Sequence, residues 1–240
     1  MTVQKVAIIT GASRGIGAGL VAGYRGRGWA VLASARTIRS SQDPDLLTVA
    51  ADITEPATAD RIVDAALDRF GRLDTLVNNA GVCISKPFTD DTAADYAAVV
   101  GVSLTGFFWL TQRAISEMAV RYGGHVVNVG ASLAEVEDSA LPAVLAALAK
   151  GGLAAATRSL AIEYAALGIR VNAVSPGIIQ TSIDSAGSSD GHGGLASPLG
   201  HVGQVSDVVD GVLFLESSPY ITGEILHVDG GQAAGHNGPL

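Results

Sequence analysis

Hydrophobic and polar positions divide the chain into short apolar runs that alternate with longer amphipathic stretches. The short runs are uncharged and rich in β-branched residues, which is typical of strands buried on both faces of a sheet. They span residues 6–9, 30–35, 46–51, 73–77, 126–129, 169–174 and 224–228. The amphipathic stretches predict a helix that opens near residue 18 and further helices over residues 57–70, 93–122, 142–166 and 205–215, with a break near Gly101. This alternation predicts an α/β fold with a doubly wound parallel sheet of about seven strands and with ligands at the carboxyl ends of the strands.

A glycine-rich turn lies between the first strand and the first helix, where residues 10–17 read TGASRGIG. Strand, glycine turn and helix together point free backbone N–H groups and the amino end of the helix at a phosphate. Gly11 allows the tight turn, while Gly15 and Gly17 let the backbone approach a pyrophosphate and let the helix sit close to the sheet. A glycine triplet alone is weak evidence in a chain with 30 glycines, so the prediction depends on its place after a buried strand.

Composition narrows the class of protein. The 240 residues are 48% hydrophobic and 16% charged, which fits one domain with a large core over residues 1–240. A net charge of −8 argues against nucleic acid as a partner, and a single cysteine leaves no disulfide and no cysteine metal site. The first strand starts too early for a signal peptide, and no apolar run reaches the length of about 18 residues that a membrane span needs. We therefore expect a soluble cytoplasmic protein.

Residues 182–200 interrupt the regular pattern, because they are rich in Gly and Ser and poor in core residues. A helix and a strand still follow this segment, so it is predicted to be a flexible substrate flap of the same domain and not a linker.

Further motifs follow the glycine turn in a fixed order: Asp52-Ile53, NNAG at residues 78–81, RVNAVSPG at residues 170–177 with Thr181 beyond it, and VDGG at residues 228–231. With the glycine turn they resemble the short-chain dehydrogenase/reductase family, and the resemblance runs from Lys5 to Gly231. It implies a single-domain Rossmann-like fold that holds a nicotinamide dinucleotide. The residues that it implies for cofactor binding are Gly11, Ser13, Arg14, Ile16, Gly17, Arg36, Asp52, Ile53, Asn79, Ala80, Gly81, Lys150, Pro176, Gly177, Ile179 and Thr181.

Charge at the end of the second strand indicates which dinucleotide is bound. Relatives that prefer NAD place an acidic residue there, whereas this chain has Ala35 followed by Arg36. A carboxylate would repel a 2′-phosphate, but a guanidinium pairs with it in a bidentate manner. Arg14 lies beside the same pocket in related proteins, so the sequence predicts NADP(H).

The catalytic pattern of the family is broken at its centre. The resemblance implies a Tyr hydroxyl that protonates the carbonyl oxygen, a Lys one helical turn later, a Ser that steadies the oxyanion and an Asn that completes a proton relay. The run after Lys150 fixes the register, so Lys150 is the family lysine and Ala146 stands in the place of the tyrosine. No other tyrosine lies between Tyr122 and Tyr164, so none can replace it.

Two more catalytic positions are altered. Alignment on Asn128 puts Ala131 at the place of the serine, so that Ser132 reaches this place only through a one-residue bulge. Ser103 stands where the asparagine is usual.

Another side chain could supply the proton. The loop after the fifth strand offers Asp138, with Glu135, Glu137 and Ser139 beside it, and His192 and His201 lie on or near the flap. We take Lys150, Ser132 and Asp138 as the catalytic candidates and expect no metal site.

The resulting hypothesis is an atypical NADPH-dependent oxidoreductase that reduces a small carbonyl or imine substrate. An iminium carbon accepts hydride without building an alkoxide, so it needs no phenol. The alternative is an NADP-binding protein without redox turnover, either a scaffold for cyclisation or isomerisation or a partner subunit. A small-residue face at Ala143, Ala147, Gly151 and Ala154 suits helix contact, so we expect a homo-oligomer, either a tetramer or a dimer.

Several large or reactive side chains are interpreted as packing residues. Cys83, just past the strand-four motif, could touch substrate, but it is read as a small buried residue. Trp29, Trp109 and the Phe107-Phe108 pair are read as core residues.

Overall fold

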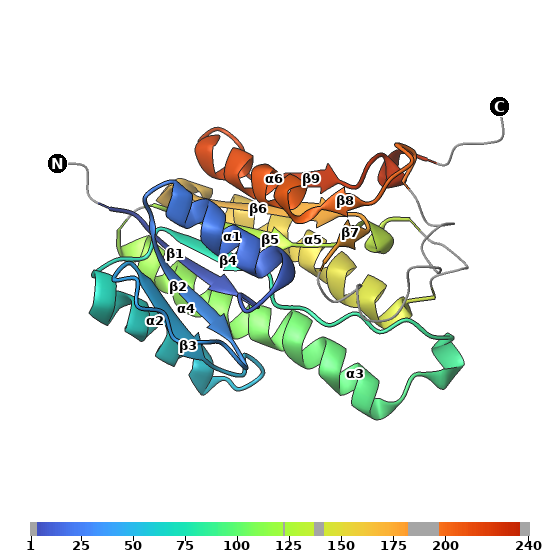
Figure 1. Ribbon diagram of the computed structural model, residues 1–240, viewed down its shortest axis with the longest axis horizontal. Coiled ribbons are helices and arrows are strands. Elements are labelled where there is room, and N and C mark those ends of the chain that lie inside the picture. The colour runs from blue at the N-terminus through green and yellow to red at the C-terminus, as the bar shows by residue number, and fades with distance from the viewer. Residues whose placement is uncertain (1–3, 122, 137–141, 182–196, 236–240) are drawn as a thin grey trace.

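The computed structural model describes residues 4–121, 123–136, 142–181 and 197–235 (Figure 1). Within these residues seven strands form one parallel sheet, as predicted, and their order is β3-β2-β1-β4-β5-β6-β9. Its strands are β1 (Val6–Thr10), β2 (Ala30–Ala35), β3 (Leu46–Ala50), β4 (Thr75–Asn78), β5 (Gly124–Val129), β6 (Ile169–Pro176) and β9 (Ile225–Val228). Two further short strands, β7 (Ile179–Gln180) and β8 (Gly203–Gln204), pair with each other outside this sheet.

Helices cover both faces of the sheet (Figure 1). On one face, α1 (Gly15–Gly26) packs beside α6 (Val205–Ser217), and their apolar side chains share a core with alternate residues of the strands. On the other face, α2 (Ala57–Phe70), α4 (Gly106–Val120) and α5 (Val144–Tyr164) enclose a second core. Neighbouring residues of β1 show the division, because Ile8 belongs to the second core and Ile9 to the first.

The predicted helix over residues 93–122 is interrupted where the sequence indicates a break. α3 (Ala93–Val100) begins with a capping box, in which Thr92 and Asp95 each bond the backbone N–H of the other. A π-helical turn, η2 (Gly101–Thr105), then leads into α4. A Cβ at Gly106 would lie 2.5 Å from Ile53, so the glycine lets this turn lie against the end of β3.

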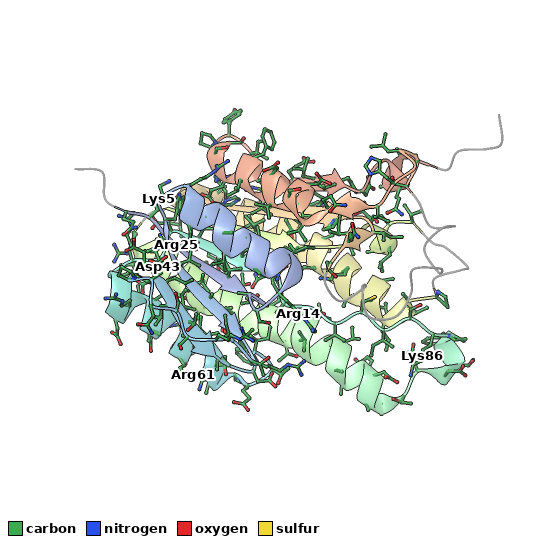
Figure 2. All side chains as sticks on the ribbon, viewed as in Figure 1. Lys5, Arg14, Arg25, Asp43, Arg61 and Lys86 are labelled. Carbon is green, nitrogen blue, oxygen red and sulfur yellow. The ribbon has the colours of Figure 1, made fainter. Side chains whose placement is uncertain are left out.

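The order of the strands creates a crevice at the carboxyl ends of two central strands. β1 and β4 are neighbours, but the chain leaves β1 toward β2 and leaves β4 toward β5. Helices on opposite faces therefore separate above the carboxyl ends of these two strands, which is the usual ligand position in such sheets. Figure 2 labels Arg14 beside the amino end of α1 at this end of the strands, whereas Lys5, Arg25 and Asp43 lie at the opposite end.

Three packing predictions are wrong. Phe108 and Trp109 are 52% and 36% exposed on the outer side of α4, because Leu110 and Ala114 occupy the side that faces the sheet. Cys83 is exposed, because the segment that follows β4 runs over the surface. Trp29 is buried as predicted and packs edge-to-face on Tyr24, with ring centroids 5.1 Å apart.

Two helical stretches, Ala93–Val120 and Val144–Leu167, are long and apolar enough to cross a membrane by length and composition. This is weak evidence for a membrane span, since helices that pack on the core of a soluble protein pass the same test. In the first stretch α4 packs on the sheet and α3 extends beyond the ends of the strands, and in the second stretch α5 packs on the sheet (Figure 1). Most of the predicted flap, residues 182–196, lies outside the described residues.

Candidate active site

Two motifs that lie almost seventy residues apart interlock at the crevice. Thr10 Oγ1 accepts hydrogen bonds from the backbone N–H groups of Asn79 and Ala80, each at 3.0 Å. In return, Asn79 Nδ2 donates to the carbonyl oxygens of Thr10 at 2.9 Å and Gly11 at 3.2 Å. The end of β4 therefore fixes the glycine turn that follows β1.

The glycines of this turn are required by geometry. Gly11 has a φ of +64°, a backbone conformation that other residues rarely adopt. A Cβ at Gly17 would lie 2.2 Å from the carbonyl oxygen of Gly11, so no other residue fits between α1 and the turn. The amino end of α1 has no acidic residue in its first turn and thus presents an uncompensated positive dipole end.

A cleft of about 1210 Å³ opens above the turn. Most of the residues predicted for cofactor binding line it: Gly11, Ser13, Arg14, Ile16, Gly17, Arg36, Asp52, Ile53, Asn79, Ala80, Gly81 and Thr181. The remaining four, Lys150, Pro176, Gly177 and Ile179, do not line it. Ser41 and Thr48, from the segments around β3, do line it and had no sequence signal, because neither belongs to a motif.

Positive charge dominates the wall of the cleft beyond β2. Arg14, Arg36 and Arg39 line it, and Asp52 is the carboxylate among the lining residues. The backbone N–H and the hydroxyl of Thr54 bond Asp52 Oδ1 at 3.0 and 2.8 Å, and with the charge of Arg36 they hold the pKa of Asp52 below its usual value. Ala35 ends β2 without a carboxylate.

A buried amide network connects α5 to the sheet. Asn78 Nδ2 donates to Asn128 Oδ1 and to Thr111 Oγ1, and Asn128 Nδ2 donates to Thr157 Oγ1, each at 2.9 Å. This chain of bonds joins β4, β5, α4 and α5. It fixes the height of α5, and therefore of Lys150, relative to the strand ends.

Lys150 lies between two elements at the edge of the cleft. Its Nζ donates to the carbonyl oxygen of Val129 at 2.7 Å and would lie 3.3 Å from a Cβ at Gly81, which lines the cleft. Part of the side chain stays accessible, but burial lowers the pKa of Lys150 to about 8, an effect that the nearby Cys83 opposes. Ala146, one helical turn earlier, is buried and brings no hydroxyl to this place.

The structure brings Ser132 to a different neighbour. Ser132 begins a short turn, η3 (Ser132–Ala134), where it is buried and donates from Oγ to Gln232 Oε1 at 3.2 Å. It is Ala131, and not Ser132, that lines a small cavity together with Lys150. Gln232 lies 100 residues away in the sequence, so no local pattern indicates this contact.

The other candidates divide into described and undescribed residues. Ser103 is buried within η2, and its Oγ has no hydrogen-bond partner within the described residues. His201 is exposed. Asp138 lies outside the described residues, as do Glu137, Ser139 and His192. In the described part of the chain, no cluster of His, Cys, Asp and Glu could hold a metal ion.

Glu135 joins side chains from two strands that sequence reasoning did not connect. Its Oε2 lies 2.9 Å from His227 Nε2, and its Oε1 accepts a hydrogen bond from Ser175 Oγ at 3.4 Å. Ser175 and His227 are register partners on β6 and β9, which places both side chains on one face of the sheet.

Comparisons with known proteins agree with the motifs. A family model described as enoyl-(acyl carrier protein) reductase matches residues 11–233. The chain is 32% identical to the 3-oxoacyl-acyl-carrier-protein reductase FabG of Escherichia coli (strain K12), over 95% of this chain and 96% of the relative.

Solved structures have the same fold. One, ElxO with NADP bound, has a TM-score of 0.89 at 28% identity and covers 97% of this chain and 100% of its own. Another, a 3-ketoacyl-(acyl-carrier-protein) reductase from Brucella melitensis complexed with NADH, has a TM-score of 0.88 at 29% identity, with coverage of 97% and 100%. With the interlocked motifs at the head of the sheet, these matches show that the chain belongs to the short-chain dehydrogenase/reductase family.

Proposed function

We propose that this protein is an NADPH-dependent oxidoreductase of an atypical short-chain type that reduces a small carbonyl or imine compound. The observation that carries the proposal is the cleft whose wall holds Arg14, Arg36 and Arg39, with Lys150 at its edge. Of the similar structures above, one holds NADP and the other NADH, so family membership alone does not choose the cofactor. The arginines and the neutral Ala35 favour the phosphorylated form.

The residues present fit such a dinucleotide. The glycine turn between β1 and α1 offers backbone N–H groups and a helix end to the pyrophosphate, and a side chain at Gly11 or Gly17 would fill that space. Arg14 and Arg36 would hold the 2′-phosphate, and Asp52 with Ile53 would contact the adenine. Lys150 would hold the nicotinamide ribose, with Pro176, Gly177, Ile179 and Thr181 beside the ring. Bound NADPH supplies a hydride.

The altered site determines which substrates fit. A positioned acid–base group contributes about 10²- to 10⁴-fold to a rate, and Ala146 has none to offer. Reduction of an iminium carbon needs no proton at the moment of hydride transfer, so it loses less from this change. We therefore place imines, and carbonyls whose oxygen Lys150 protonates, in the substrate class.

A second candidate is an NADP-binding protein without redox turnover. The observation that favours it is the bond between Ser132 and Gln232, because that bond commits the Ser132 hydroxyl to an internal partner. Such a protein would act as a scaffold for cyclisation or isomerisation, or as a partner subunit.

We also propose a homo-oligomer, a dimer or a tetramer. Apolar side chains on the outer faces of two neighbouring helices support this, namely Phe108, Trp109 and Val120 on α4 and Leu148 and Ile162 on α5. Sedimentation of the purified chain would give twice or four times the mass of one chain, whereas a monomer would contradict the proposal.

Turnover is tested by following the absorbance of NADPH with a panel of ketones and cyclic imines, with Lys150→Ala as the matched control. The proposal predicts oxidation of NADPH with imines, slower oxidation with ketones, and loss of both in Lys150→Ala. Binding of NADPH without any oxidation would support the scaffold candidate instead.

A further inference from the structure

The carboxylate of Glu135 lies between solvent and the interior. On one side it meets His227, and both side chains are more than a third exposed. On the other side it accepts the bond from Ser175, which is 1% exposed. A carboxylate that takes a proton from an imidazolium becomes a carboxylic acid, which can donate that proton to a hydroxyl, so these three groups can pass a proton inward.

A small cavity continues this line inward. Its volume is about 10 Å³, which is the space that one water molecule needs. Three side chains in its wall carry polar groups, namely Glu135, Ser175 and Lys150. The rest of the wall is made of glycine, alanine, leucine and isoleucine residues. A water in this cavity would find hydrogen-bond partners in the groups that Glu135 and Lys150 bring to it.

Lys150 separates this cavity from the dinucleotide cleft. Its side chain lines the cavity, while its Nζ would touch a Cβ at Gly81, which lines the cleft. The groups that face Lys150 are Cys83 from the segment after β4, the carbonyl of Val129 from β5, and Glu135 across the cavity. The ammonium uses one N–H on Val129, which leaves two for the cavity and the cleft.

We propose that His227, Glu135 and Ser175 form a proton route that recharges Lys150, and that Lys150 protonates the substrate oxygen in place of the absent tyrosine. The inference rests on the proposed function. The substrate carbon receives the hydride of NADPH, and one electron pair of the carbon–oxygen double bond moves to the oxygen. The Lys150 N–H bond breaks and its proton joins the oxygen, which leaves an alcohol, NADP⁺ and a neutral amine.

The neutral amine then takes a proton from the cavity water, the water takes one from the Ser175 hydroxyl, and Ser175 takes one from Glu135. Glu135 has that proton because its carboxylate first takes it from a protonated His227, which solvent then protonates again. One proton thus enters for each alcohol formed, and no other reactant is needed. Because the pKa of Lys150 is lowered to about 8, both its charged and its neutral form are accessible near neutral pH.

The test compares Glu135→Gln with Glu163→Gln, a change of the same kind at an exposed position on α5. Each enzyme is assayed on a ketone and on an N-alkylated cyclic iminium ion, which takes hydride and no proton. We expect Glu135→Gln to lower kcat on the ketone about 10- to 100-fold. The KM for NADPH, the rate on the iminium ion and all rates of Glu163→Gln should stay within about twofold of the unmodified enzyme. Formate should restore ketone reduction in Glu135→Ala, because a small acid can replace the missing carboxyl group.

Equal rates of Glu135→Gln and the unmodified enzyme on the ketone would overturn the route, as would an unmodified enzyme that reduces the iminium ion but no ketone. Failure on both substrates would instead contradict the proposed function. A second test, which does not depend on turnover, is a high-resolution crystal structure of the cofactor-free chain. An ordered water between Ser175 and Lys150 supports the route, and a dry cavity overturns it whatever the assay shows.

Discussion

Ser132 Oγ donates a hydrogen bond to Gln232 Oε1 at 3.2 Å, which joins the turn after β5 to the segment after β9. Asp229 sets this contact, because its two carboxylate oxygens accept the N–H groups of Gly231 at 2.9 Å and Ala233 at 2.7 Å. Gly231 has a φ of +94°, and a Cβ at Gly177 would lie 2.4 Å from Gln232 Oε1. The VDGG motif therefore turns the chain so that an amide side chain lies against both Ser132 and Gly177.

Gln232→Ala should raise kcat/KM about 2- to 10-fold, because the Ser132 hydroxyl would no longer be committed to an internal partner, and such a bond contributes about 0.5–1.5 kcal/mol. Steady-state kinetics on the preferred substrate measure this change. A fall in kcat/KM would show instead that Gln232 contacts the substrate.

Two glycines of α1 give opposite expectations for the same substitution. Gly17→Ala should destabilise the protein by about 1–3 kcal/mol and abolish dinucleotide binding, because the new methyl would overlap the carbonyl oxygen of Gly11. Gly26→Ala meets nothing within 4 Å and should stabilise by about 0.4–1 kcal/mol. Urea unfolding of both variants makes the comparison, and similar effects would contradict the close approach of α1 to the turn.

Lys150→Met should stabilise the cofactor-free protein by about 1–3 kcal/mol at pH 7 while it abolishes turnover. Burial lowers the folded pKa of Lys150 to about 8 from an unfolded value near 10.5, so the charged lysine costs stability below pH 8. Between these two pKa values the unfolded chain binds the extra proton, so this cost shrinks as the pH rises.

Denaturant titrations of both proteins at pH 7 and pH 9.5 measure the difference. The gain from Lys150→Met should be smaller at the higher pH. A gain that grows with pH would contradict this account, because it would mean that the folded protein stabilises the charged form of Lys150.

Glu216 is the centre of a buried polar cluster at the opposite edge of the sheet. Its Oε2 accepts bonds from Tyr24 at 2.9 Å and Thr75 at 2.9 Å and lies 3.0 Å from His125 Nδ1. Burial raises the pKa of Glu216, but the groups that bond it outweigh burial and hold the pKa below 4.5. Burial lowers the pKa of His125 below 6.5, although Glu216 opposes this.

Glu216→Gln should therefore destabilise by about 2–4 kcal/mol at pH 7, whereas the exposed Glu163→Gln should change little. Both shifted groups bind protons more weakly when folded, so stability falls on acidification, first below pH 6.5 through His125 and then below pH 4.5 through Glu216. Because Glu216 raises the pKa of His125, its loss should lower that pKa further, so thermal melts from pH 7.5 to pH 4.5 should show a steeper acid loss in Glu216→Gln. An unchanged slope would remove Glu216 from the acid response.

The sequence predicted most of the fold because local patterns carry it. The bounds of β2 and α2 agree with the predicted ranges 30–35 and 57–70, and the break near Gly101 is where η2 begins. The dinucleotide cleft was also predictable, since its motifs stand at strand ends. What the sequence could not indicate is which side chains meet across the strands, such as Ser132 with Gln232. The predicted burial of Cys83 and Trp109 was wrong for the same reason, because burial depends on which neighbours cover a residue.

We expect the cofactor preference to depend on Arg36, which lines the cleft. Removing a guanidinium that bonds a phosphate costs about 1.5–3 kcal/mol, so Arg36→Asp should weaken NADPH about 10- to 150-fold and leave NADH almost unchanged. A loss that is equal for both dinucleotides would mean that Arg36 does not contact the 2′-phosphate.

The most direct measurement is a titration of the unmodified chain with NADPH and, separately, with NADH, followed by the fluorescence of the bound nicotinamide. An arginine-lined cleft that holds the 2′-phosphate predicts binding of both, with NADPH at least about tenfold tighter. Tighter binding of NADH, or no binding of either dinucleotide, would contradict the account.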